Sequence, residues 1–292
     1  MELIFDIEGL RLKAKTWGDI SGTPVLAIHG WLDNANTFDK LGPLLSSDLY
    51  LVAIDLAGHG LSDHRSVNSA YYLWDYARDI INITEILGWK KFTILAHSMG
   101  TGIASIVAGS MPNLIDKLIF IDGLGAPFVV EQENIVSNFK RSIKQLKMAK
   151  KTKLYGFSSS NEHQFTTKEE AVHDRMSTSI GAISYESSSC LTERSLYKTP
   201  KGYRWRYDPR IVLPECYRMT EVQAQLFIRE ITCETLIILG NQGLFSDGMF
   251  NERLNEFKHR EVHWIDGGHH LHLEDKHNEI VTLIKQFLQI EF

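Results

Sequence analysis

A serine at a predicted strand-to-helix turn is the first residue in this sequence that could do covalent chemistry. The segment Phe92–Gly102 begins as a short apolar run, breaks at His97-Ser98-Met99, and continues in a helical pattern. Such a turn holds a serine on a strained backbone with its hydroxyl directed out of the sheet. Ala96 and Gly100 are small enough for the strand and the helix to approach each other closely. Ser98 is therefore a candidate nucleophile, although a serine here could also be an ordinary helix N-cap.

Acidic and basic side chains follow other apolar runs of the chain. Asp55 and Asp122 each come directly after such a run, and His269-His270 follows Gly267-Gly268 near the C-terminus. In an open α/β sheet, ligands bind beyond the carboxyl ends of the strands. These side chains should therefore meet Ser98 at one edge of a sheet, in the chain order nucleophile, acid, base.

Strand and helix signals alternate on both sides of a different middle region. Strands are predicted at Leu10–Trp17, Val25–Ile28, Leu51–Ile54, Phe92–Leu95, Leu118–Ile121, Thr235–Leu239 and Glu261–Ile265. Helices are predicted at Ala35–Leu45, Trp74–Leu87, Gly100–Gly109, Met249–Phe257 and Glu279–Leu288. Alternating β and α units predict an α/β fold, a mostly parallel sheet with helices on both faces.

The middle region, residues 127–230, lacks buried-strand runs and has helix-like polar stretches at Asn138–Lys153, Glu169–Thr178 and Glu221–Arg229. We interpret it as a mainly helical insertion before the last two strands, with residues 1–126 and 231–292 forming the core. The lysine-rich stretch at Asn138–Lys153 is read as a solvated helix face rather than an anion-binding surface.

The composition excludes several classes of function. The 292 residues carry a net charge of −5, which disfavours nucleic acid or an anionic membrane as a partner. No stretch approaches the roughly 20 apolar residues that cross a bilayer, and the N-terminus does not resemble a signal peptide. Three widely spaced cysteines, Cys190, Cys216 and Cys233, favour a reducing compartment. These features predict a cytoplasmic protein, a monomer or a homodimer.

Four segments together resemble the α/β-hydrolase superfamily, in particular a capped serine hydrolase of the serine-hydrolase-like branch. They are His29–Phe38, Asp55–Ser62, Ala96–Gly100 and Gly268–Glu274. They occur in the expected order and cover nearly the whole chain. The resemblance implies an α/β-hydrolase fold in which the middle region is a helical cap.

The resemblance also assigns roles. It implies that Ser98 is the nucleophile and His269 the general base, because His269 has the family's spacing. His270 is one residue away and stays an alternative, whereas His272 is expected to pack or to hydrogen-bond near the last helix.

The acid of the triad is less certain from the sequence. Many relatives place an aspartate where this chain has Gly243, and a glycine cannot orient an imidazole. Some capped relatives instead use an acid at the end of the strand before the cap, where Asp122 stands. Asp122 is therefore the preferred acid, and Asp247 the alternative.

An oxyanion hole needs two backbone N–H groups directed at the developing negative charge. Met99, the residue after the nucleophile, and Trp31, in the loop after the Val25–Ile28 strand, are the expected donors. Asp55 and His59 are read as structural supports of this loop. His29, His97 and His269 lack metal-ligand spacing, and no dinucleotide motif follows a strand. We therefore expect no metal and no cofactor.

The resulting prediction is a cofactor-independent serine hydrolase that acts on a small ester or acyl substrate through an acyl-enzyme. A carbon–carbon bond (diketone) hydrolase or an amidase with the same triad remains possible. So does a non-catalytic binding protein, which the glycine at position 243 favours. The aromatic segment Tyr203–Tyr207 is expected to cover the site and to select the substrate.

Overall fold

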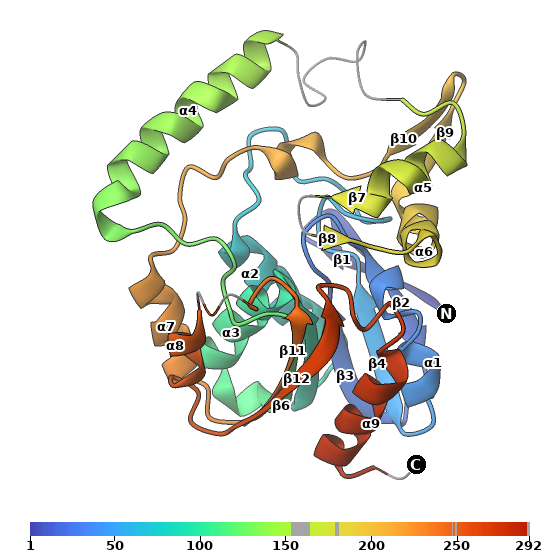
Figure 1. Ribbon diagram of the computed structural model, residues 1–292, viewed down its shortest axis with the longest axis vertical. Coiled ribbons are helices and arrows are strands. Elements are labelled where there is room, and N and C mark those ends of the chain that lie inside the picture. The colour runs from blue at the N-terminus through green and yellow to red at the C-terminus, as the bar shows by residue number, and fades with distance from the viewer. Residues whose placement is uncertain (153–163, 179–180, 247, 249, 291–292) are drawn as a thin grey trace.

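A computed structural model describes residues 1–152, 164–178, 181–246, 248 and 250–290 (Figure 1). Within these residues, eight strands form one sheet in the order β1-β2-β4-β3-β5-β6-β11-β12. Their bounds are β1 Glu2–Ile7, β2 Leu10–Trp17, β3 Thr23–Ile28, β4 Leu49–Ile54, β5 Phe92–His97, β6 Ile115–Ile121, β11 Glu234–Gln242 and β12 Arg260–Gly268. β2 pairs antiparallel with both β1 and β4, whereas all the other neighbouring pairs of this sheet, from β4–β3 to β11–β12, are parallel. The predicted mostly parallel sheet is confirmed.

Helices cover both faces of the sheet because the central strands are apolar on both sides. The core helices are α1 Gly42–Leu45, α2 Leu73–Ile86, α3 Gly100–Ser110, α8 Asn251–Leu254 and α9 His277–Leu288. Buried side chains of α2 and α3, such as Ile80 and Ile103, form one apolar core with the sheet. Those of α1 and α9, such as Leu45 and Ile284, form a second core on the opposite face.

Two of the predicted core helices are shorter than the sequence pattern indicates. The stretch predicted as one helix at Ala35–Leu45 is a 3₁₀ helix, Ala35–Phe38, followed by the separate α1. Pro43 lies in the first turn of α1, where its missing N–H costs nothing. A helix that began before Pro43 could not continue through it, because proline cannot donate the required hydrogen bond. Of the helix predicted at Met249–Phe257, Met249 lies outside the described residues and the helical part of the others is α8.

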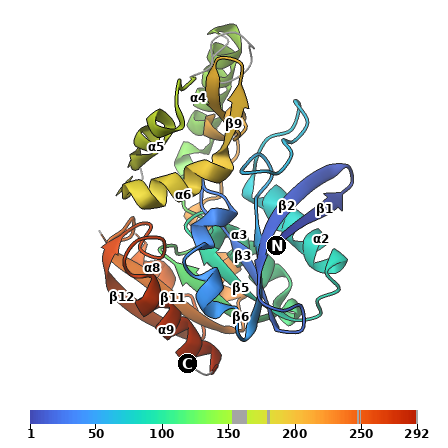
Figure 2. The same ribbon diagram turned by 90° about the vertical axis from the view of Figure 1, so that its right-hand side faces the viewer.

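Residues 127–230 lie between β6 and β11, as expected, and extend beyond the carboxyl ends of the parallel strands (Figures 1 and 2). Their helices are α4 Ile135–Thr152, α5 Lys168–Met176, α6 Tyr185–Ser195 and α7 Glu221–Arg229. Two short hairpins add β7 Ser177–Thr178 with β8 Gly181–Ala182, and β9 Leu196–Thr199 with β10 Gly202–Trp205. We call residues 127–230 the inserted segment.

The register of the parallel strands brings their carboxyl ends together. His97 at the end of β5 pairs with Ile121 at the end of β6, and Ile121 pairs with Ile238 of β11. The residues that follow these strands, Ser98 and Asp122, must therefore lie on the same edge of the sheet. In the described part of the chain, no helix is both long and apolar enough to span a membrane.

Candidate active site

Ser98 occupies a strained turn between β5 and α3. Its φ of 52° lies in the left-handed region, which a non-glycine residue adopts only under constraint. Its N–H donates a hydrogen bond to the carbonyl of Ile121 at 3.1 Å, which joins the turn to β6. Gly100 is required two residues later, because a Cβ there would overlap the backbone carbonyl of Ile28. The turn therefore places Ser98 outside both β5 and α3.

His269 connects Ser98 to Asp122. The Ser98 hydroxyl lies 2.9 Å from Nε2 of His269, and Nδ1 of His269 lies 2.5 Å from Oδ2 of Asp122. In a neutral imidazole held this way, Nδ1 donates to the carboxylate and Nε2 accepts from the hydroxyl. These distances allow the transfer of a proton from Ser98 to His269. We call this arrangement the Ser98–His269–Asp122 chain.

The alternatives to these residues lie elsewhere. Nε2 of His270 lies 3.2 Å from Oδ2 of Asp33, and Nε2 of His272 lies 2.9 Å from Oγ1 of Thr37. Neither imidazole is bonded to Ser98. Asp247, the alternative acid, lies outside the described residues.

Asp122 is held by backbone N–H groups from the end of β11 and from the loop that follows it. Gly240 donates to its Oδ1 at 3.0 Å, and Leu244 donates to its Oδ2 at 3.1 Å. The φ of Asp122 is 40°, so Asp122, like Ser98, has a left-handed backbone at the end of a strand. A Cβ at Gly243 would overlap the Asp122 carboxylate. The glycine is thus the residue that leaves room for an acid supplied by β6.

The His269 imidazole is buried, and burial lowers its pKa to about 4, although the hydrogen bond to Asp122 acts in the opposite direction. The neighbouring rings of His97 and His270 lower this pKa further. The imidazole is therefore neutral near pH 7 and able to accept a proton.

The two expected oxyanion-hole donors lie next to the Ser98 turn. Met99 immediately precedes α3, at the helix start. Trp31 follows Gly30, where a Cβ would come within 2.9 Å of the Ser98 Cβ. The indole of Trp31 donates to the carbonyl of Ile211 at 3.3 Å, which links this loop to the inserted segment.

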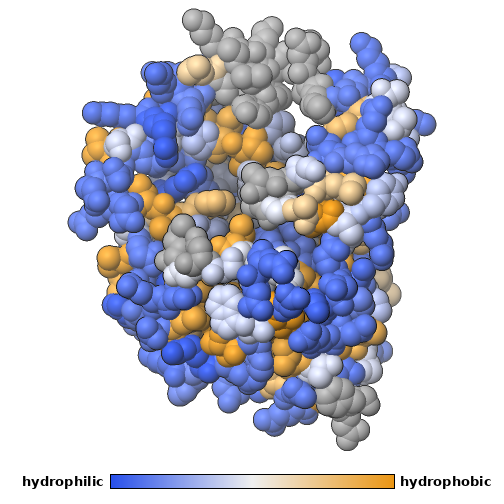
Figure 3. Space-filling model, in the orientation of Figure 1, coloured by the Kyte–Doolittle hydropathy of each residue, from blue (hydrophilic) through white to orange (hydrophobic). Residues whose placement is uncertain are grey.

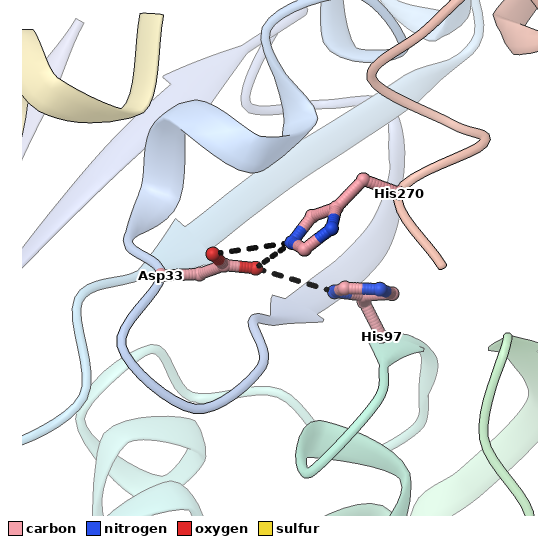
Figure 4. Close-up of side chains that lie close together, drawn as sticks. All are labelled: Asp33, His97 and His270. Carbon is pink, nitrogen blue, oxygen red and sulfur yellow. Dashed lines mark hydrogen bonds and ion pairs between the residues drawn. The ribbon is translucent and has the colours of Figure 1, made fainter. Parts of the chain in front are cut away.

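Behind the Ser98–His269–Asp122 chain, Asp33 gathers two further histidines (Figure 4). Oδ2 of Asp33 lies 3.4 Å from Nδ1 of His97 and 3.2 Å from Nε2 of His270, and all three side chains are buried. The other nitrogen of His97, Nε2, donates to the backbone carbonyl of His269 at 3.0 Å. This bond fixes the backbone at His269.

Asp33, His97 and His270 also present ligand atoms within 4.8 Å of one another, as a metal site would. However, Arg175 of α5 places its guanidinium 2.5 Å from Oδ1 of the same carboxylate. A cation there already compensates the buried charge of Asp33 and would repel a divalent metal. We therefore interpret the group as an ion-pair network that supports the loop after β12, which carries His269 and His270.

Asp55 and His29 also act as supports. The Asp55 carboxylate accepts from the N–H groups of Ala35 and Leu61, both at 2.8 Å. Nδ1 of His29 donates to the carbonyl of Gly30 at 2.7 Å, and its Nε2 accepts from the Leu56 N–H at 3.0 Å. Both nitrogens of His29 are thus engaged, which leaves no ligand atom for a metal.

A cavity of about 620 Å³ opens on Ser98. Its lining is mostly aromatic and aliphatic and includes Trp31, Tyr71, Met99, Phe128, Leu213 and Phe250, with Glu215 and Arg218 as charged members. The molecular surface is hollowed between the inserted segment and the core, and hydrophobic side chains gather around the hollow (Figure 3).

The aromatic segment Tyr203–Tyr207 does not line this cavity, contrary to the expectation from the sequence. Its strand β10 pairs with β9, and Trp205 packs against Phe165 with ring centroids 5.4 Å apart. These rings form a small core of the inserted segment itself. The residues of the inserted segment that reach the cavity are instead Pro127, Phe128, Gln145 and most of Ile211–Arg218.

A model of the α/β hydrolase fold family matches residues 23–276. The chain belongs to this family. It is 34% identical to a serine hydrolase-like protein of Dictyostelium discoideum over 91% of this chain and 76% of that protein. It is also 31% identical to serine hydrolase-like protein 2 of Homo sapiens, over 96% of this chain and 91% of that protein. These relatives place this α/β hydrolase in the serine hydrolase-like branch.

Solved structures agree with the fold. A hypothetical protein from Pseudomonas aeruginosa PAO1 is 35% identical, with a TM-score of 0.90 over 99% of both chains. The thioesterase domain from the curacin biosynthetic pathway shares the fold at 22% identity, with a TM-score of 0.79 over 97% of this chain and 98% of that one.

Two residues near His270 in this α/β hydrolase, Asp33 and Arg175, were not predicted from the sequence. Asp33 lies inside the His29–Phe38 segment that carries the family resemblance, so its position was the available signal. Arg175 comes from the inserted segment, and nothing in its local sequence pairs it with an aspartate 142 residues away.

Proposed function

We propose that this hydrolase is a cofactor-independent serine esterase that cleaves a small carboxylic ester through an acyl-enzyme. One observation carries the proposal: the Ser98 hydroxyl is hydrogen-bonded to His269, which is hydrogen-bonded to Asp122, and it faces a largely apolar cavity. A hydroxyl, a neutral base and an orienting carboxylate in this order are the parts that acyl transfer requires.

In the first half of the reaction, Oγ of Ser98 attacks the ester carbonyl carbon as its proton moves to Nε2 of His269. The tetrahedral intermediate collapses when the bond to the alcohol oxygen breaks, and His269 returns the proton to the leaving alcohol. In the second half, water attacks the acyl-enzyme and gives a proton to His269. The carboxylic acid then leaves, and the proton returns to Ser98. Asp122 keeps its charge and stabilises the imidazolium in both halves.

The negative charge on the carbonyl oxygen needs donors that are in place before the reaction. We assign this role to the backbone N–H groups of Met99 and Trp31. Met99 supplies the start of α3, and Trp31 lies in the loop that Gly30 brings against Ser98.

We further propose that the inserted segment, residues 127–230, is a cap domain over a core of residues 1–126 and 231–292. It contributes much of the cavity lining, so substrate choice would depend on it. Its contacts through Arg175 to Asp33 and through Ile211 to Trp31 would position it over the site.

The proposal is tested by labelling with a fluorophosphonate probe and by hydrolysis of p-nitrophenyl esters of increasing acyl length. The wild-type protein should be labelled and should turn over the short esters. The Ser98→Ala variant should lose both the labelling and the turnover. The Ser110→Ala variant, which replaces an exposed serine at the end of α3, should retain both. Labelling that persists in a folded Ser98→Ala variant would remove Ser98 as the nucleophile.

The same serine chemistry handles amides and vinylogous diketones, so these serve as the comparison substrates. Faster turnover of either one than of every ester would reassign the reaction class. A non-catalytic role was suggested by the glycine at position 243. This argument for a non-catalytic role is weakened because the Asp122 carboxylate occupies the space that an acidic side chain at position 243 would need.

A further inference from the structure

The cavity that opens on Ser98 has charged side chains in an otherwise mostly apolar lining. Arg218 and Glu215 both belong to the loop between β10 and α7 and both line the cavity. A charged group in an apolar pocket is costly unless it has a partner, and such a group commonly fixes the orientation of a ligand. These two residues are therefore candidates for substrate recognition.

Arg218, whose side chain is only partly buried, lacks the close carboxylate that the buried arginines Arg253 and Arg194 have. Arg253 lies 2.6 Å from a carboxylate oxygen of Glu221, and Arg194 lies 2.8 Å from one of Asp55. Nε of Arg218 is 3.8 Å from Glu215, beyond hydrogen-bond distance, and is buried without a hydrogen-bond partner among the described residues.

The surroundings of Arg218 keep its guanidinium in place. It lies 5.5 Å from the centroid of the Phe128 ring, a distance at which a cation is attracted to the ring face. The Glu215 carbonyl accepts from Ser142 at 2.9 Å and from Asn138 at 3.3 Å, so α4 fixes the loop. The arginine is thus held by the fold with donor capacity left over.

Glu215 compensates this charge incompletely. Burial raises the pKa of Glu215 to about 7, against the opposing effect of Arg218. Near neutral pH, a substantial fraction of the Glu215 side chains is therefore protonated and uncharged. A ligand anion that bonded to Arg218 directly would gain a charge-assisted hydrogen bond that the protein itself does not make.

We propose that Arg218 is a specificity residue that binds an anionic group, most simply a carboxylate, at the far end of the substrate's acyl chain. The proposal places the acyl group in the cavity that opens on Ser98, because this part of the substrate stays bonded to Ser98 after the alcohol leaves. The substrate class is then a monoester of a dicarboxylic acid. This inference rests on the proposed esterase function and narrows it.

The experiment compares mono-p-nitrophenyl esters of succinic, glutaric and adipic acid with the p-nitrophenyl esters of the uncharged acids of equal chain length. For at least one length, kcat/KM for the charged ester should exceed that of its neutral partner by about tenfold or more. The ratio should fall to about one in Arg218→Met and should be partly kept in Arg218→Lys. In Glu215→Gln it should rise, because a competing carboxylate is removed.

Arg229→Met is the matched control. This arginine is half-exposed on α7 and pairs with Glu256, away from the cavity. Its variant should keep the wild-type ratio. Circular dichroism of each variant separates loss of recognition from loss of the fold.

Binding is measured separately by calorimetry with Ser98→Ala and the free dicarboxylic and monocarboxylic acids. Tighter binding of the dicarboxylic acid, lost in Ser98→Ala/Arg218→Met, supports the subsite even if no ester is turned over, in which case only the proposed function fails. Hydrolysis of neutral esters with no preference for a charged chain at any length would overturn the inference and leave the esterase proposal intact.

Discussion

A side chain at position 243 would occupy the space taken by the Asp122 carboxylate. Asp122 follows the end of β6 and accepts hydrogen bonds from N–H groups on both sides of Gly243, from Gly240 in β11 and from Leu244 in the loop after it. The two positions therefore exclude each other as sites for the acid. Gly243, which looks like a missing catalytic residue in the sequence, leaves the space that the Asp122 carboxylate occupies in the fold.

This relationship predicts the outcome of Gly243→Asp. The new side chain would overlap Asp122 and place a second negative charge beside it, so kcat/KM should fall at least about tenfold. Overpacking of this kind costs about 1–3 kcal/mol, which urea unfolding should detect. Asp122→Asn, which keeps the shape of the acid, should lower kcat by roughly 10⁴ with little change in stability. If Gly243→Asp were more active than the wild type, the acid would be missing from the native site.

The pH dependence of ester hydrolysis should have an unusually low acid limb. His269 works as a base only when it is neutral, and burial lowers its pKa to about 4. Activity should therefore be constant from about pH 8 down to pH 5 and fall with a midpoint near pH 4. The hydrogen bond to Asp122 raises this pKa, so the residual activity of Asp122→Asn should show its midpoint at still lower pH. Initial rates of kcat/KM, with circular dichroism at each pH, give the measurement. A midpoint near pH 6.5 in a folded protein would contradict it.

The sequence predicts the sheet edge well because its signals are local. Ser98 follows a buried apolar strand and precedes a helix, so strand, turn and helix could each be recognised from neighbouring residues. The central strands were likewise found because parallel strands buried on both faces are continuous apolar runs. The position of Asp122 at the end of such a run made it a candidate, and the fold brings it to His269.

The parts that depend on distant residues could not be predicted in this way. The hairpin β9–β10 is stabilised by its packing on Phe165, and its aromatic residues looked like a substrate-binding surface when taken alone. The pairing of Arg175 with Asp33 depends on how the inserted segment folds back over the core. The cavity lining is determined by the same packing, which no local periodicity encodes.

His97 should affect kcat although it makes no hydrogen bond to the Ser98 hydroxyl. Its Nε2 donates to the backbone carbonyl of His269, and this bond holds the peptide that carries the base. His97→Ala should lower kcat by about tenfold to a hundredfold, since a small misplacement of a catalytic group is costly, with little change in KM. His97→Gln, whose amide can reach the same carbonyl, should recover part of the loss.

The control for His97 is His263→Ala on β12, which removes a half-exposed imidazole paired with Glu261 and should leave kcat unchanged. Steady-state kinetics on the preferred p-nitrophenyl ester decide the result. A role limited to packing would raise KM and lower kcat together, and glutamine would not restore the rate.

Removing Arg194 of α6 should cost much more stability than removing the exposed Arg229. Its guanidinium bonds to the buried carboxylate of Asp55 at 2.8 Å and to Glu2 at 2.7 Å. Arg194 therefore connects the inserted segment to β1, which contains Glu2, and to the end of β4, which Asp55 follows. Arg194→Met would leave the Asp55 charge buried without its cation, which costs about 3–5 kcal/mol. The exposed pair of Arg229 with Glu256 should contribute less than about 1 kcal/mol. Urea unfolding of Arg194→Met and Arg229→Met measures both, and equal, small losses would mean that Asp55 is adequately stabilised by the N–H groups of Ala35 and Leu61 alone.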